Sequence, residues 1–155
     1  MTGLSRKARY ALRALYALTA DEARGPVLIA DLADRERIPR KFLETILLEL
    51  KNAGVLKSKK GKGGGYALAR APEQITMGQI IRIIDGPLAP LPCASERAYV
   101  KCEECTDDAT CGTRQVMKKV RDAVAAILDS TTLADVQAQI VRARASTASS
   151  VTYSI

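Results

Sequence analysis

The chain has 155 residues, of which 47% are apolar and 26% charged, so it can bury a core and is not disordered throughout. It contains no histidine, which excludes Ser-His-Asp and Cys-His catalytic units and zinc fingers of the two-Cys-two-His type. Residues 1–70 carry 15 Lys and Arg against 7 Asp and Glu, whereas residues 71–155 carry 9 against 10. This asymmetry indicates a polyanionic partner for the first half, nucleic acid before membrane.

The first half of the chain contains three helical patterns followed by a hairpin pattern. We expect helices over Leu4–Glu22, capped by Ser5, over Ile29–Arg37, and from Pro39 to about Asn52. Two short strand-like runs follow, Val55–Ser58 and Tyr66–Ala69, joined by a segment of lysines and glycines.

The second half begins with Thr76–Gln79, a capping box that opens a helix ending before Gly86. Residues 86–112 form a long loop with all four cysteines, and loops of this length usually have a function or are disordered. We expect helices over Thr113–Asp129 and Thr132–Arg144, then a frayed tail from Ser146. Four apolar side chains at helical spacing predict a seam for a partner helix: Met117, Val120, Val124 and Ile127.

The order of these elements predicts a mainly α fold with a small β-hairpin wing. Two helices joined by a tight turn and followed by a basic glycine-rich hairpin are typical of a winged helix-turn-helix domain. We assign residues 1–85 to this DNA-binding domain, 86–112 to a cysteine-rich sensor loop, 113–145 to dimerisation helices and 146–155 to a flexible tail.

The predicted contacts with duplex DNA come from the second helix of the motif and from the wing. Arg40 and Lys41 lie in the first turn of that helix, where cations oppose the helix dipole unless a phosphate or a guanine edge lies nearby. The wing lysines reach phosphates and so supply affinity and salt dependence rather than sequence specificity. The predicted DNA-binding set is Arg40, Lys41, Thr45, Lys57, Lys59, Lys60, Lys62, Gly63, Gly64 and Tyr66.

Several segments together resemble the Rrf-type transcription regulators, the group of IscR, NsrR and CymR. They are LSRKARYALRALYALT, KSKKGKGGGYALA and LDSTTLADV, and the resemblance covers about residues 2–137. It implies a homodimeric transcription factor that reads a palindromic operator, with the helix from Thr113 crossing its twin. Lys60-Gly61 stands where family members usually have Arg-Gly, which keeps the charge but loses the bidentate fork.

The four cysteines, Cys93, Cys102, Cys105 and Cys111, fall within 19 residues, close enough to hold one soft metal centre. Many Rrf-type regulators hold an iron–sulfur cluster with three cysteines of this loop, and IscR-like members add a histidine three residues after the last one. Arg114 stands there and offers no lone pair. Our hypothesis is therefore an all-thiolate [2Fe–2S] or [4Fe–4S] cluster, with Cys102 or Cys105 as the fourth ligand.

Other uses of the cysteines stay open at this point. They are a structural zinc site of four thiolates, metal-free redox thiols with Cys102 and Cys105 as the pair, and inert buried cysteines. A cluster-free regulator of cysteine or sulfur metabolism, as in CymR-like members, is the main alternative function. A small iron–sulfur carrier leaves the basic half unexplained. An enzyme is disfavoured because no acid–base pair is apparent.

The chain is expected to be cytoplasmic, without a membrane partner. No stretch approaches the roughly 18 apolar residues of a membrane span, and Met1–Lys7 lacks the apolar stretch of a signal peptide. A cluster in the loop is expected to act on DNA binding through geometry, because the loop joins the DNA-binding domain to the dimer helix. Recognition helices of a dimer must lie about 34 Å apart to read successive half-sites.

Overall fold

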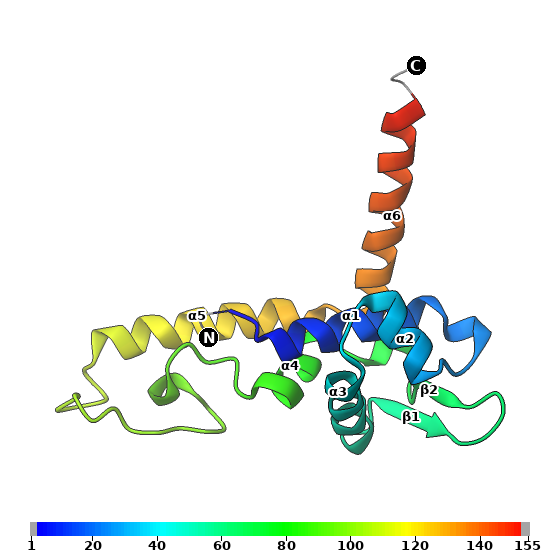
Figure 1. The fold of residues 1–155 in the computed structure, drawn as a ribbon. Helices are drawn as coiled ribbons and strands as arrows, with labels where there is room; N and C mark the ends of the chain where they lie inside the picture. Colours follow the sequence, from blue (N-terminus) through cyan, green and yellow to red (C-terminus); the bar gives the residue numbers. More distant parts are fainter. Residues whose placement is uncertain (1–2, 153–155) are drawn as a thin grey trace.

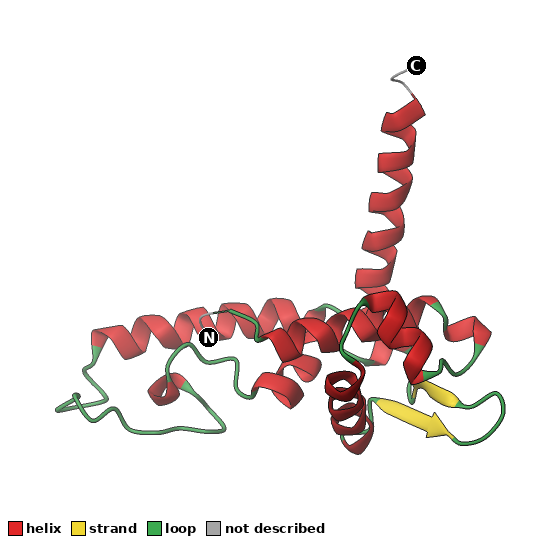
Figure 2. Ribbon diagram, viewed as in Figure 1, coloured by secondary structure: helices red, strands yellow, loops and turns green. Residues whose placement is uncertain are grey.

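The computed structural model describes residues 3–152, with side chains described for residues 3–149. Helices and one two-stranded hairpin make up the fold, as the sequence predicted (Figures 1 and 2). The elements, in chain order, are α1 (Arg6–Ala20), the single turn η1 (Glu22–Arg24), α2 (Ile29–Glu36), α3 (Arg40–Asn52), β1 (Leu56–Lys59), β2 (Gly65–Leu68), the turn η2 (Pro72–Gln74), α4 (Met77–Asp85), the turn η3 (Pro92–Ala94), α5 (Gly112–Ser130) and α6 (Leu133–Thr152).

The core lies between α1, α2, α3, α4 and the hairpin. Its largest side chains with almost no exposed surface are Leu15, Leu32, Leu43, Ile46, Leu47, Leu50, Val55, Ile75, Ile80 and Leu133. The predicted cap of α1 is confirmed, since the Ser5 hydroxyl accepts the Ala8 N–H at 2.9 Å. The Ser5 N–H and hydroxyl in turn donate to the Asp85 carboxylate, which ties the start of α1 to the end of α4.

The helix-turn-helix is formed by α2 and α3. Arg37 joins them in the left-handed conformation, with φ of 52° and ψ of 48°. Pro39 immediately precedes α3, whereas the sequence predicted it as the first residue of that helix. Helix α3 lies beside the hairpin (Figure 1). Its polar residues Arg40, Lys41 and Thr45 are exposed.

The hairpin pairs Leu56 with Leu68 and Lys59 with Gly65 in antiparallel register. The first strand therefore begins and ends one residue later than predicted, and the second begins and ends one residue earlier. Val27 bonds to the backbone of Tyr66 through both its N–H and its carbonyl, at 2.9 and 2.8 Å. The segment before α2 therefore acts as a short third strand and fixes the wing to the helical body.

Residues 86–112 connect α4 to α5 and contain a single helical turn, η3, which the sequence did not predict. A 3₁₀ turn beginning at proline loses little there, because the missing N–H has no helical partner at that position.

The last helix, α6, is longer than expected, so the prediction of a frayed tail is wrong from Ser146 to Thr152; residues 153–155 of that predicted tail lie outside the described residues. The helix continues to Thr152 and stands away from the rest of the fold (Figure 1). Alanine is the best helix former, and this segment contains Ala143, Ala145 and Ala148. The hydroxyls of Ser146 and Thr147 donate to carbonyls four residues earlier, so their hydrogen bonds are made within the helix.

Helix α5 is attached to α4 by both side chains and backbone. Arg82 and Asp129 form two bonds, at 2.5 and 2.9 Å. The Met77 N–H donates to the Thr131 carbonyl, and the Leu133 N–H donates to the Ile75 carbonyl, each at 2.9 Å. The C-terminal end of α5 is thus held firmly against the DNA-binding domain, whereas its N-terminal end carries the cysteine loop.

Within the described residues, no helix has the length and apolar character needed to cross a membrane.

Candidate DNA interface and cysteine loop

The first two turns of α3 present its predicted DNA-binding side chains to solvent. Arg40, Lys41 and Thr45 are all exposed. Arg40 pairs with Glu44 at 3.3 Å, with both side chains about half exposed or more, and such surface pairs contribute only about 0–1 kcal/mol. The guanidinium can therefore exchange this carboxylate for a phosphate or a base edge at little cost.

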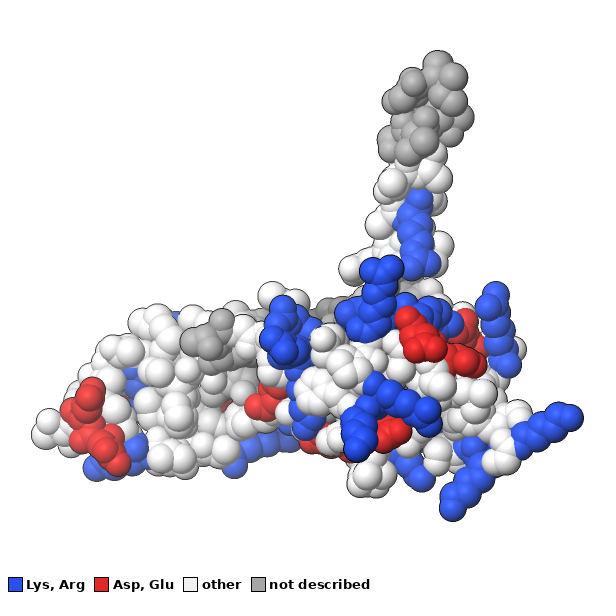
Figure 3. Space-filling view, viewed as in Figure 1, with Lys and Arg blue, Asp and Glu red and all other residues white. Residues whose placement is uncertain are grey.

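The four wing lysines, Lys57, Lys59, Lys60 and Lys62, are all exposed. Figure 3 shows basic side chains projecting from the hairpin end of the molecule, next to those of the helix-turn-helix. Together they form a cationic end on the DNA-binding domain, as the charge distribution of the sequence indicated.

The wing glycines and Tyr66 have structural tasks as well. Gly63 has φ of +72°, and a Cβ at Gly64 would lie 2.3 Å from the Lys59 carbonyl oxygen. Gly64 is buried, and the half-buried Tyr66 packs against the core. The structure thus places these residues at the base and turn of the wing, where they set the position of the lysines.

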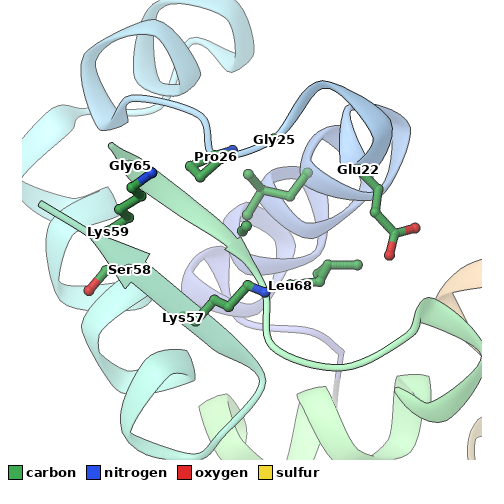
Figure 4. A pocket seen from close by; sticks show the side chains of 10 residues that line it. Glu22, Gly25, Pro26, Lys57, Ser58, Lys59, Gly65 and Leu68 are labelled. Carbon is green, nitrogen blue, oxygen red and sulfur yellow. The ribbon is translucent and has the colours of Figure 1, made fainter. Parts of the chain in front are cut away.

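Two features of this surface were missed by the sequence reading. Arg37 is exposed in the turn between α2 and α3. The only feature of the sequence that could have indicated it is a basic residue at the end of a predicted helix. A cavity of about 370 Å³ lies between β1 and the Gly25-Pro26 turn, with Lys57 and Lys59 at its edge (Figure 4). The strand alternation puts those two lysines on one face of the wing.

Three of the four thiols come together at the start of α5. The Sγ atoms of Cys105 and Cys111 lie 3.7 Å apart, and Cys102 hydrogen-bonds to Cys105. Cys111 caps α5, where its Sγ accepts the Arg114 N–H at 3.5 Å. That bond is the main cause of the lowered pKa of Cys111, whereas the hydrogen bonds with Cys111 and Cys102 raise the pKa of Cys105 to about 11.

Cys93 lies apart from this group. It is buried on η3, 6% exposed, and its thiol makes no hydrogen bond with the other three. Its carbonyl accepts the Arg114 Nε–H at 2.8 Å. Cys105 therefore contacts Cys111 as well as Cys102, its partner in the pair expected for metal-free redox thiols.

Two arginines of α5 fasten the loop to that helix. Arg114 also donates to the Asp108 carbonyl at 3.3 Å, and its guanidinium lies over the Tyr99 ring, 5.6 Å from the ring centre. Arg121, whose side chain is only 11% exposed, donates to the Ala94 carbonyl at 2.5 Å and pairs with Glu96 at 3.1 Å. The two guanidinium groups therefore help to order the loop on α5, together with Gln115, whose side-chain amide donates to the Ala109 carbonyl at 3.2 Å.

The donor set fits a metal centre in part. Two thiolates on one tetrahedral metal with bonds of about 2.3 Å lie roughly 3.8 Å apart, close to the Cys105–Cys111 separation. One oxygen of Asp108 is buried without a hydrogen-bond partner in the same loop. No cluster of three or more metal-binding side chains is fully assembled among residues 3–152. Cys102, Cys105 and Cys111 are the thiols that approach such an arrangement.

The four predicted dimer residues lie along one side of α5 but differ in their exposure. Val120 and Ile127 are 40% and 65% exposed and share a stripe with Val116, which is 54% exposed. Met117 and Val124 are half-buried. In the exposed apolar stripe, Val116 therefore takes the place predicted for Met117, and Val124 is not part of it.

The structure contains a winged helix-turn-helix domain with exposed basic side chains on α3 and the wing. The domain is joined to a long helix, α5, that carries a loop with four cysteines. This combination defines a DNA-binding regulator. The chain belongs to the Rrf2 family, described as iron-dependent transcriptional regulators, which matches residues 4–139.

Individual relatives agree with this assignment. A putative HTH-type Rrf2-like regulator of Rhodobacter capsulatus is 44% identical over 87% of this chain and 92% of its own length. CymR, the global cysteine regulator of Bacillus subtilis, has a solved structure with a TM-score of 0.73 and 34% identity, over 90% of this chain and 98% of that one. The structure of T. potens IscR has a TM-score of 0.71 and 30% identity, over 89% and 88% of the two chains. These relatives are regulators by name, not enzymes.

Replacing Arg114 by alanine should loosen the cysteine loop in metal-free protein. The carbonyls of Cys93 and Asp108 lose a charged donor, and hydrogen bonds of that kind contribute about 1.5–3 kcal/mol. We expect amide hydrogen exchange over residues 93–111 to accelerate about tenfold or more. Lys119→Ala, at an exposed site on the same helix, should leave the rates unchanged. Equal exchange in both variants would show that Arg114 does not order the loop.

Proposed function

We propose that the chain is a homodimeric transcription regulator that binds a palindromic operator and senses iron–sulfur or redox status through its cysteine loop. The observation that carries this proposal is the arrangement along α5. One end of that helix is fixed to the DNA-binding domain, and the other end gathers Cys102, Cys105 and Cys111. A change at the thiols is therefore connected to the reading domain by one rigid element.

The DNA-binding part of the proposal rests on charge and exposure. Arg40, Lys41 and Thr45 on α3 face solvent at the place where a recognition helix meets base edges and phosphates. The lysines of the wing lie beside them and are suited to contact the flanking backbone. Basic groups outnumber acidic ones only in this half of the chain.

The dimer part rests on the stripe of Val116, Val120 and Ile127. These apolar side chains lie on one face of α5 and no described residue covers them. We assign the stripe to contact with the same helix of a second copy, because a twofold interface pairs identical surfaces. Met117 and Val124, at the edge of this surface, pack toward their own chain.

The sensing part rests on the thiols and on the family description as iron-dependent. Cys102, Cys105 and Cys111 would hold the cluster, and the cluster would supply reversible electron transfer or iron-dependent assembly. Arg114 and Arg121 orient the loop on α5, while Arg82 and Asp129 hold the far end of that helix. Loop order and the spacing of the recognition helices are thereby linked, and the state of the site biases DNA affinity.

A cluster-free regulator of cysteine or sulfur metabolism is the second candidate. The observation that favours it is the set of hydrogen bonds from Arg114 and Arg121 to loop carbonyls, which hold the loop through groups of this chain. The likeness to B. subtilis CymR supports the same candidate. Structural zinc held by the loop thiolates is a further version of the same fold.

Measurements on anaerobically purified protein separate these candidates. The iron–sulfur version expects stoichiometric iron and acid-labile sulfide, visible absorption and a paramagnetic signal after reduction or oxidation. Operator-library binding should then differ between holo, oxidised and chelated protein. A colourless protein with stoichiometric zinc contradicts the iron–sulfur version, and DNA binding unchanged by iron removal favours the cluster-free regulator.

Replacing Lys60 by alanine should weaken binding to all duplexes nearly equally. The side chain is expected to contact phosphate only, so its loss releases fewer counterions on binding. The slope of log affinity against log salt should fall by roughly one unit per protomer. Arg142→Ala on α6, which stands away from the wing, should leave the slope unchanged (Figure 1). A slope unaffected by Lys60→Ala would remove this lysine from the interface.

Replacing Val120 by glutamate should convert dimers to monomers that bind operator DNA poorly. A carboxylate at the centre of the stripe would be buried without a partner. Analytical ultracentrifugation gives the oligomeric state. Leu48→Glu makes the same kind of change at an exposed apolar side chain of α3 and should stay dimeric. Dimers of Val120→Glu at wild-type strength would rule out this stripe as the interface.

A further inference from the structure

Helix α3 carries one leucine that the core does not use. Leu48 is 51% exposed, whereas the other leucine and isoleucine side chains of the helix are buried: Leu43, Ile46, Leu47 and Leu50. Single exposed leucines are common on protein surfaces, so exposure alone assigns no role to this one. Its position on the helix is therefore what decides its role.

Leu48 lies on the face of α3 that is expected to meet DNA. It follows Lys41 and Thr45 at intervals of four and three residues, and all three side chains are exposed. Residues at these intervals are neighbours on one face of a helix, with Cβ atoms about 5–6 Å apart. Leu48 therefore continues this face by one turn beyond Thr45.

The Thr45 side chain adds a second apolar group beside Leu48. Its hydroxyl donates to the Lys41 carbonyl at 3.3 Å, so the hydroxyl hydrogen is used within the helix. The methyl group is then the part of Thr45 that remains for a partner. The Thr45 methyl and Leu48 together form a small apolar surface on the exposed side of α3.

Cationic side chains surround this apolar surface. Arg40 and Lys41 lie on its N-terminal side and Lys51 on its C-terminal side, all exposed, and the wing with its four exposed lysines lies beside the helix (Figure 1). The acidic residues nearby, Glu44 and Glu49, are each paired with a cation. A partner that fits this surface has an anionic backbone and apolar groups between its charges. Duplex DNA meets both requirements, because thymine places its C5-methyl group in the major groove between the two phosphate backbones.

We propose that Leu48, together with the Thr45 methyl, contacts the C5-methyl groups of thymines in the major groove, and that Leu48 is a specificity-determining residue. This inference rests on the proposed function and names the chemical group that α3 reads. It adds a residue to the DNA-binding set expected from the sequence, which contained Thr45 but not Leu48.

A methyl contact supplies a selectivity that the wing lysines lack. Contacts to phosphate bind every duplex, whereas only thymine presents a methyl group in the major groove. Contact between apolar groups removes their surface from water, and burial of one methyl group strengthens binding by about fourfold. A dimer contacts two half-sites, so loss of the methyl from both should weaken binding by roughly fifteenfold.

The test is a double-mutant cycle between the protein and the duplex. Wild-type protein first recovers its preferred duplexes from a random-sequence library. One recovered duplex is then made with deoxyuridine at single thymine positions of both half-sites, because uracil pairs as thymine does but lacks the C5-methyl group. Fluorescence anisotropy at one salt concentration gives the affinities of full-length wild type, Leu48→Ala and Val141→Ala. Val141, which is 55% exposed on α6, is the control, and circular dichroism checks that each variant folds.

The proposal expects deoxyuridine at one thymine position of each half-site to weaken wild-type binding about fifteenfold. Leu48→Ala should bind the thymine duplex weakly by a similar factor and respond to deoxyuridine by about twofold at most. Val141→Ala should respond to deoxyuridine as wild type does.

Two results would overturn the assignment of Leu48 while leaving DNA binding intact. One is an equal response of wild type and Leu48→Ala to deoxyuridine at every position. The other is a Leu48→Ala variant that binds every duplex as tightly as wild type, which would assign the exposed leucine to a partner other than DNA. If wild-type protein recovers no duplex from the library, the proposed function itself fails.

Discussion

The attachment of α5 to α4 is the constraint on which the rest of the molecule depends. The Arg82–Asp129 pair and the backbone bonds from Met77 and Leu133 fix one end of a 19-residue helix to the DNA-binding domain. Gly78 permits this closeness, because a Cβ there would lie 2.0 Å from the Asp129 Oδ1. Every feature along α5, including the apolar stripe and the thiols, is consequently held in a fixed relation to α3.

The cysteine loop is held to α5 by a second kind of interaction. Guanidinium groups of Arg114 and Arg121 bond to loop carbonyls, so side chains of this chain place the loop backbone on α5. Preorganised ligands lose less conformational entropy on metal binding than ligands drawn from a disordered loop.

The sequence predicted the fold well where local chemistry decides it. Ser5 and Thr76 cap the helices that they were expected to cap, and the glycines between Lys59 and Tyr66 form the expected wing. The end of α6 was predicted too early, since serine and threonine suggested fraying while alanine and hydroxyl-to-carbonyl bonds sustain the helix. The candidate site was predicted as four cysteines, but spacing along a chain does not tell which way a loop folds. Cys93 is therefore apart from the group, and the unpaired oxygen of Asp108 had no signal in the sequence.

The sequence by itself determined the order of the helices and wing, the basic first half, the absence of histidine chemistry and the family. Those properties follow from residue type and short-range spacing, which act within a few positions of each residue. Only the tertiary structure decided which thiols meet, which face of α5 stays uncovered, and that arginines fasten the loop. Those outcomes depend on contacts between residues far apart in the chain, such as Cys93 with Arg114 and Arg82 with Asp129, and they are set by packing rather than by local pattern.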